Sequence, residues 1–135
     1  MWYPPSLHAT KSDPGSATAL AESPQGVLHA YLNATPTQGD EGLINFVAFR
    51  LEHLRAENGS SPTEVAHAAN LTFRGGTGTC VIDVYVAKAK HTYREIACFV
   101  KGKGPGTVIV GAAPPADWPT MGPLLERAVA AYQVR

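Results

Sequence analysis

The alternation of apolar and polar residues in the second half of the chain predicts consecutive β-strands. Residues 79–87 and 92–100 are rich in β-branched and aromatic side chains, which favour a pleated, half-buried surface. The connection 88–91 is short, so these two segments should form an antiparallel hairpin. Residues 71–74 are a further strand candidate before the hairpin, and residues 107–113 follow it. The pattern therefore predicts an antiparallel meander of three or four strands.

Apolar residues three and four positions apart predict a helix over residues 41–57. The members of this stripe are Leu43, Phe46, Val47, Leu51 and Leu54. Asp40 can cap the start of the helix, and Asn58-Gly59 supplies a left-handed stop. This segment is the clearest amphipathic helix of the chain.

Two shorter helices are predicted from capping signals and spacing. The first covers residues 61–70, where Ser61 can cap the start, Pro62 fits the first turn, and Glu64 completes a capping box. The second covers residues 124–133, and its apolar residues recur at helical spacing. That stripe consists of Leu125, Ala128, Val129 and Tyr132.

The first part of the chain is the most irregular. Residues 4–26 contain several prolines and glycines, which break helices and favour loops and edge strands. Two short strands are predicted there and just beyond, at residues 18–21 and 27–33. Strands with helices packed against them predict an α+β fold, with an antiparallel β-sheet and helices on its faces. Residues 1–135 should form a single domain.

Composition narrows the classes of function. The chain has 11 basic and 11 acidic side chains, and its formal net charge at pH 7 is zero. A nucleic-acid module usually carries a basic surplus, so we expect no nucleic-acid partner. No apolar run approaches the length of a membrane span, so we expect no direct membrane insertion. The first residues also lack the basic and apolar regions of a secretory signal.

Familiar catalytic and metal-binding motifs are not found in the sequence. The histidines are His8, His29, His53, His67 and His91, and none has a partner at zinc-binding spacing. The glycine-rich segment 74–79 precedes a predicted strand instead of a helix, so we interpret it as a turn and not as a phosphate loop. No nucleophile motif is present. We therefore expect no catalytic residue, no metal and no cofactor.

The hairpin register brings the two cysteines together. If residue numbers of paired positions sum to 178, Cys80 lies opposite Cys98 and Ile82 lies opposite Ile96, on a core face. Opposed cysteines can be within bridging distance, and closing this loop would stabilise the fold by roughly 3 kcal/mol. The alternative is two buried free thiols that pack as small apolar residues. We favour the disulfide, because the only two cysteines of the chain are paired.

The same register gathers polar residues on the opposite face of the hairpin. Asp83 and Tyr85 lie near Tyr93 and Glu95, and we take these four as the candidate binding residues. Two facing carboxylates would raise one pKa, which can mark an acid pair of a hydrolase. The alternative is that Arg74, or a lysine from a neighbouring strand, neutralises the pair.

Several segments resemble the PsbP/Mog-like α/β/α sandwich family, in a form similar to uncharacterised actinobacterial domains. The segments are Tyr3-Pro4-Pro5, residues 31–36, Phe73-Arg74-Gly75-Gly76, residues 93–98 and residues 125–129. They are spread over most of the chain and are patterns of hydrophobicity, not catalytic signatures. Known relatives are binding proteins: extrinsic photosystem subunits, a Ran-GTPase partner, mycobacterial lipoproteins and secretion-effector chaperones.

The resemblance implies a non-enzymatic binding or adaptor domain that engages a protein partner. Two alternatives remain: a small-ligand carrier with a pocket between sheet and helix, and a small hydrolase that uses Asp83 and Glu95. The family also contains lipoproteins, and a disulfide persists in oxidising surroundings. We therefore expect an extracytoplasmic domain of a longer or processed protein, with a cytoplasmic location as the alternative.

Overall fold

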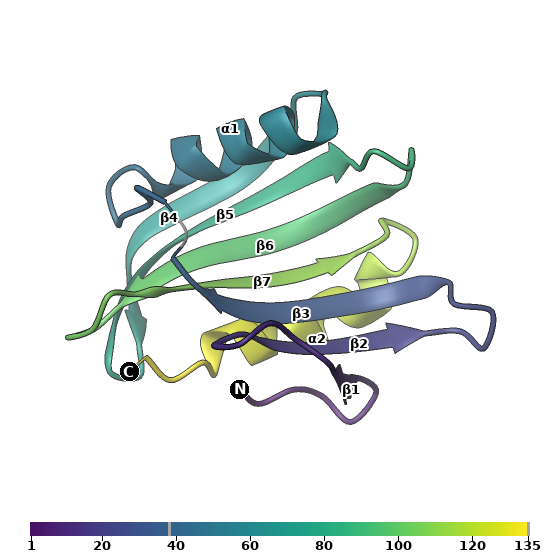
Figure 1. The fold of residues 1–135 in the computed structure, drawn as a ribbon, viewed down its shortest axis with the longest axis horizontal. Helices are drawn as coiled ribbons and strands as arrows, with labels where there is room; N and C mark the ends of the chain where they lie inside the picture. Colours follow the sequence, from purple (N-terminus) through teal and green to yellow (C-terminus); the bar gives the residue numbers. More distant parts are fainter. Residues whose placement is uncertain (38, 135) are drawn as a thin grey trace.

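Seven strands form one antiparallel sheet, and one helix packs on each of its faces (Figure 1). A computed structural model describes residues 1–37 and 39–134. The strand order in the sheet is β1-β2-β3-β7-β6-β5-β4. In chain order the elements are β1 (His8–Thr10), β2 (Ala17–Glu22), β3 (Leu28–Pro36), α1 (Phe46–Asn58), β4 (Thr63–Phe73), β5 (Gly76–Val86), β6 (Thr92–Lys101), β7 (Thr107–Ala113) and α2 (Trp118–Ala130). The predicted α+β class is confirmed.

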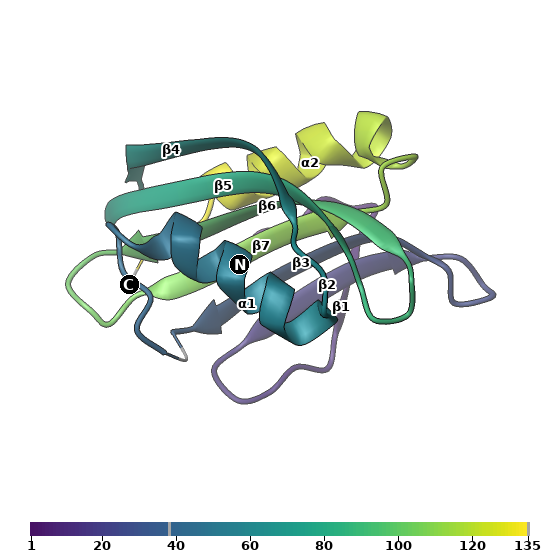
Figure 2. The same ribbon diagram turned by 90° about the horizontal axis from the view of Figure 1, so that it is seen from above.

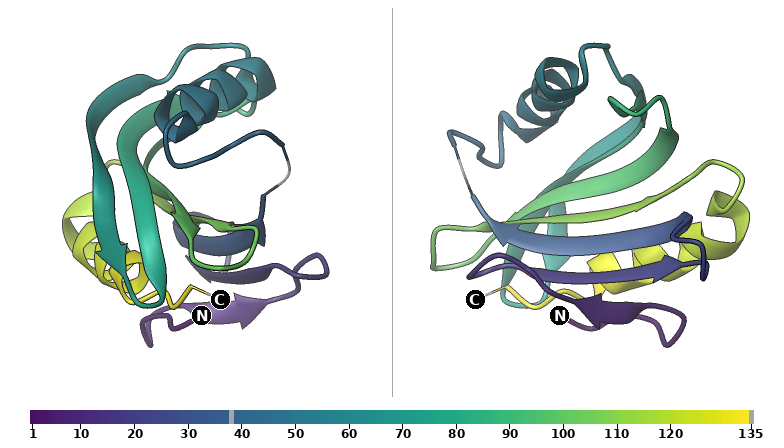
Figure 3. Two further views of the ribbon diagram at one scale, coloured as in Figure 1. Left: turned by 90° about the vertical axis from the view of Figure 1, so that its left-hand side faces the viewer. Right: turned by 45° about the vertical axis from the view of Figure 1, so that its right-hand side comes forward.

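The two helices cover different parts of the sheet (Figures 2 and 3). Helix α2 packs on β3, β6 and β7, and its buried residues Leu125 and Val129 contribute to the hydrophobic core between α2 and the sheet. Helix α1 packs on β5 and β6 on the other face, where the Phe46 ring lies 6.2 Å from the Phe99 ring, centroid to centroid. The β3 side of that face lies beyond the helix (Figure 3). The fold therefore leaves part of the sheet uncovered next to α1.

The predicted register of the β5–β6 hairpin is confirmed. Cys80 pairs with Cys98, and Asp83 pairs with Glu95. The sulfur atoms of the two cysteines lie 2.01 Å apart, at bonding distance, and their Cα atoms lie 4.1 Å apart. The pair is buried in the core beneath α2. Strand alternation then directs Asp83 and Glu95 to the opposite face, the one that carries α1.

The prediction of a helix over residues 61–70 is wrong, because residues 63–70 belong to strand β4. Its start resembles a capping box, but its backbone pairs with β5 through a hairpin whose turn is Arg74-Gly75. Gly75 adopts a φ of +88°, which glycine tolerates at no steric cost. Strand pairing therefore outweighs the local helix signal. Only Arg74-Gly75 of the glycine-rich segment 74–79 form the predicted turn between strands, and residues 76–79 belong to β5.

The helix boundaries also differ from the prediction. Helix α1 begins at Phe46, five residues after the predicted start, and Asp40 is not its cap. Asn45 instead organises the preceding loop: its side-chain nitrogen donates to the Asp40 carbonyl over 2.8 Å. The predicted stop is confirmed, since Gly59 has a φ of +77° and its N–H bonds the Arg55 carbonyl. Helix α2 begins at Trp118, ahead of residue 124, and accommodates the internal proline.

Candidate functional site

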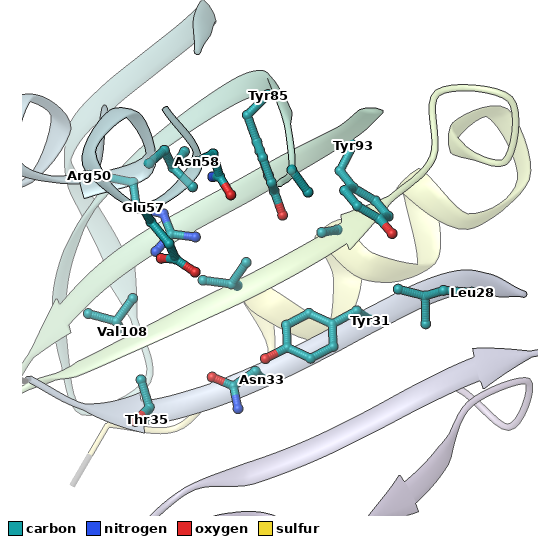
Figure 4. Close-up of a pocket in the computed structure, with 14 residues that line it drawn as sticks. Leu28, Tyr31, Asn33, Thr35, Arg50, Glu57, Asn58, Tyr85, Tyr93 and Val108 are labelled. Atoms are coloured by element: carbon teal, nitrogen blue, oxygen red, sulfur yellow. The ribbon is translucent and has the colours of Figure 1, made fainter. Parts of the chain in front are cut away.

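A groove of about 400 Å³ lies between the second half of α1 and the uncovered part of the sheet (Figure 4). We call it the α1–β3 groove. Helix α1 supplies Arg50, Leu54, Glu57 and Asn58, and β3 on the other side supplies Leu28, Tyr31, Asn33 and Thr35. The apolar floor consists of Val108, Val110 and Ala112 from β7. Tyr85, Ala87 and Tyr93, at one end of the β5–β6 hairpin, complete the lining.

Strand alternation explains which β3 side chains reach the groove. Ala30 and Leu32 are fully buried in the core beneath α2, so Tyr31 and Asn33 point to the opposite face. Tyr31 pairs with Ala112, and Ala112 pairs with Glu95 on the next strand. The small alanine between these larger side chains leaves space above the sheet. That space forms the middle of the groove.

Two tyrosines from adjacent strands pack against each other at one end of the groove. The rings of Tyr85 and Tyr93 have centroids 5.7 Å apart and are tilted by 39°. Cross-strand aromatic pairs of this kind stabilise a sheet and restrict each other's rotamers. Burial, and then the charge of Glu95, raise the pKa of Tyr85. The phenol therefore stays protonated at neutral pH and can both donate and accept hydrogen bonds.

A buried ion pair ties α1 to the sheet below the groove. Arg50 donates from Nε to Glu95 Oε2 over 2.9 Å and from Nη2 to Glu95 Oε1 over 2.8 Å. The Glu95 side chain is 0% exposed and that of Arg50 is 17% exposed. Burial alone would lower the pKa of Arg50, but the adjacent carboxylate raises it, so the guanidinium stays charged. This two-point bond fixes the Arg50 side chain against the groove wall.

Asp83 lies beside this ion pair and is also fully buried. Burial, followed by the negative charge of Glu95, raises its pKa to about 9. As an ionised group it would have two buried oxygens without a partner among the described residues. Protonation removes the repulsion between the two carboxylates and gives Asp83 a hydrogen that it can donate to Glu95. Asp83 is therefore neutral at pH 7.

The cation beside Asp83 and Glu95 is not one of the residues that the sequence predicted, which were Arg74 or a lysine from a neighbouring strand. Arg74 lies in the β4–β5 turn, and the cation that contacts Glu95 is Arg50 from α1. Both carboxyl groups are 0% exposed, and neither lines the groove. The four candidate residues therefore divide into two pairs: Tyr85 and Tyr93 line the groove, whereas Asp83 and Glu95 lie beneath it.

Neither a protein-family model nor a curated protein sequence matches this chain. Its structure is similar to the crystal structure of PA94 from Pseudomonas aeruginosa, a protein of unknown function described as a candidate regulator. The TM-score is 0.61 and the sequence identity is 15%. The superposition covers 99% of this chain and 86% of PA94. At this identity the similarity shows the fold alone.

Sequence reasoning missed most of the groove residues. The position of Arg50 on the buried side of α1 could have been predicted, because it lies four residues from both Phe46 and Leu54. Tyr31 and Asn33 could have been assigned to one face from the alternation of β3. Their approach to α1 depends on the position of the helix, which no local pattern fixes.

The part of the chain that the structure describes holds neither a metal-binding cluster nor a membrane-spanning helix. No group of three or more His, Cys, Asp or Glu side chains could hold a metal ion among residues 1–37 and 39–134. Within the same residues, neither helix is long and apolar enough to span a bilayer.

Proposed function

We propose that this domain is a non-enzymatic binding module that engages a protein partner through the α1–β3 groove. The composition and shape of the groove carry this proposal. An apolar floor lies between walls that present three tyrosines, an arginine and two asparagines. Tyrosine and arginine are enriched among the residues that dominate binding energy in protein interfaces. Such a surface suits a segment of another chain.

The groove is also held in one arrangement before a partner arrives. Arg50 is fixed by its two hydrogen bonds to Glu95, and Tyr85 packs on Tyr93. Asn33 donates to Thr18 Oγ1 over 2.9 Å. Binding loses less side-chain entropy when the contact residues are already ordered, so this arrangement favours affinity.

The hydrolase alternative has less support. A general acid and a general base must reach a substrate or a water molecule. Asp83 and Glu95 are both 0% exposed, and Glu95 is occupied by Arg50. The pair is better explained as the buried anchor of α1.

A small-ligand carrier is the second candidate, because about 400 Å³ lies within the usual range for ligand pockets. The groove opens to solvent between α1 and β3, however, and its lining includes charged and amide side chains, among them Arg50, Glu57 and Asn33 (Figure 4). An extended partner segment fits an open groove better than an enclosed small molecule does.

We make two further proposals, one on the fold family of this domain and one on its cellular location. We place the fold in the PsbP/Mog-like group, supported by the antiparallel sheet with a helix on each face. We also propose an extracytoplasmic location, supported by cysteines at bonding distance, because disulfides persist in oxidising compartments.

Selection of random dodecapeptides displayed on phage tests the function. We expect selected peptides to bind the purified protein, and Tyr31→Ala or Tyr93→Ala to weaken binding at least tenfold in calorimetry. Tyr132 is a half-buried tyrosine outside the groove, so Tyr132→Ala is the matched control and should change affinity less than twofold. Failure to select any binder, or equal loss in the control, would contradict the proposal.

A further inference from the structure

We infer that the α1–β3 groove accepts a lysine or arginine side chain from the partner segment. This inference rests on the proposed binding function and adds the chemistry of the side chain that the groove binds. Three observations carry it: the net charge of the groove, the acceptor atoms that line it, and its aromatic rings.

The charges at the groove sum to a negative value. Arg50 and Glu57 are the charged residues of the lining. The charge of Arg50 is offset by Glu95, to which it is hydrogen-bonded, and Asp83 beside them is protonated. Glu57 therefore leaves the groove with one net negative charge. Glu57 Oε2 lies 2.9 Å from His53 Nε2, on an imidazole that is charged only when protonated.

Two polar side chains, one on each wall of the groove, present acceptor atoms to it. The side-chain nitrogen of Asn33 donates to the Ala17 carbonyl over 3.3 Å and to Thr18 Oγ1 over 2.9 Å. These bonds set the orientation of the amide, so its oxygen is directed to the groove side (Figure 4). The Glu57 carboxylate points from α1 toward the groove. A guest that donates hydrogen bonds is therefore complementary to both walls.

The tyrosine rings provide the third component. Tyr31, Tyr85 and Tyr93 border the groove, and the face of an aromatic ring attracts a cation. Burial raises the pKa of Tyr31; the charge of Arg50 lowers it, and the charges of Glu57 and Glu95 raise it. The methylene stem of a lysine or arginine can at the same time cover the apolar floor.

An anionic guest would meet the opposite conditions. Arg50 uses two of its five N–H groups on Glu95, whose carboxylate offsets its charge. A carboxylate placed beside it would face the Glu57 carboxylate and the Asn33 oxygen. These repulsive contacts would exclude acidic segments from the groove.

The test uses three pools of acetylated, amidated heptapeptides with random flanks and a fixed central lysine, norleucine or glutamate. Norleucine keeps the stem of lysine and lacks its charge. Each pool is titrated into ¹⁵N-labelled protein, and the half-saturation concentration is read from the amide shifts of Tyr31 and Asn33. We expect the lysine pool to reach half-saturation at a concentration at least fivefold lower than either other pool.

Two variants assign the effect to the groove. Glu57→Gln removes the charge and keeps the shape, so it should abolish the lysine preference. Glu52 is an exposed acid of the same helix, pairs with Arg55, and does not line the groove, so Glu52→Gln should keep the preference. If the norleucine or glutamate pool binds the groove as tightly as lysine, the cation inference is wrong and the binding function stands. If no pool shifts the groove amides, both are wrong.

Discussion

Replacement of Asp83 by asparagine should stabilise the protein in a way that increases with pH. In the folded state the pKa of Asp83 is raised from 3.8 to about 9, by burial first and then by the charge of Glu95. The folded protein therefore holds a proton that the unfolded chain releases. This contribution to stability is complete below about pH 4 and is lost as the pH rises toward 9. Asparagine has no such proton and still offers an N–H donor to Glu95.

The magnitude follows from proton linkage. Each pH unit between the unfolded and folded pKa values changes the free energy of unfolding by about 1.4 kcal/mol for one proton. The free energy of unfolding of Asp83→Asn, minus that of the wild type, should therefore increase by about 3 kcal/mol between pH 5 and pH 7. The sign is positive, because only the wild type loses the contribution of the Asp83 proton over this interval.

Urea denaturation followed by circular dichroism at several pH values measures this difference. Asp13→Asn is a control at an exposed loop aspartate, and its difference from the wild type should not depend on pH over the same interval. The carboxyl carbon of Asp83 should also titrate near pH 9 by NMR. A difference that stays constant within about 0.5 kcal/mol from pH 5 to pH 8 would refute the reasoning, because it would mean that Asp83 is ionised in the folded protein.

Three further predictions concern the same scaffold. Glu95→Gln should lower the free energy of unfolding by about 3 kcal/mol in urea denaturation, since it leaves a buried guanidinium without its counter-charge. Thiol titration of protein unfolded without reductant should find no free thiol, because Cys80 and Cys98 are bonded; two reactive thiols per chain would contradict this. Gly78→Ala should lower the melting temperature and the free energy of unfolding, the latter by about 2 kcal/mol, because a Cβ there would overlap the Phe73 ring. An unchanged melting temperature would contradict this, because it would show that the strands can shift to accommodate the Cβ.

The hairpin register was predictable because side chains alternate strictly along strands. A slip of one residue would have sent the apolar set of β5 to the wrong face, so few registers were acceptable. This is why the pairing of Cys80 with Cys98 and of Asp83 with Glu95 followed from the sequence. The partner of the acid pair did not, since Arg50 reaches Glu95 only after α1 has packed on the sheet.

Strand β4 shows where local patterns fail. Residues Thr63 to Asn70 are exposed, so no buried face imposes an apolar alternation on them. The remaining local signals, a serine-proline start and several alanines, favour a helix. Pairing with β5 decides the outcome, and that interaction is tertiary. Strand β1 is only three residues long and is likewise defined by its neighbour β2.

The central claim is that the α1–β3 groove binds a partner segment. A crystal structure of the protein with the tightest phage-selected peptide tests it most directly. We expect the peptide to lie between α1 and β3, with a basic side chain near Glu57 and contacts to Tyr31 and Tyr93. A peptide bound on the α2 face, or along the open edge of β4, would contradict the claim.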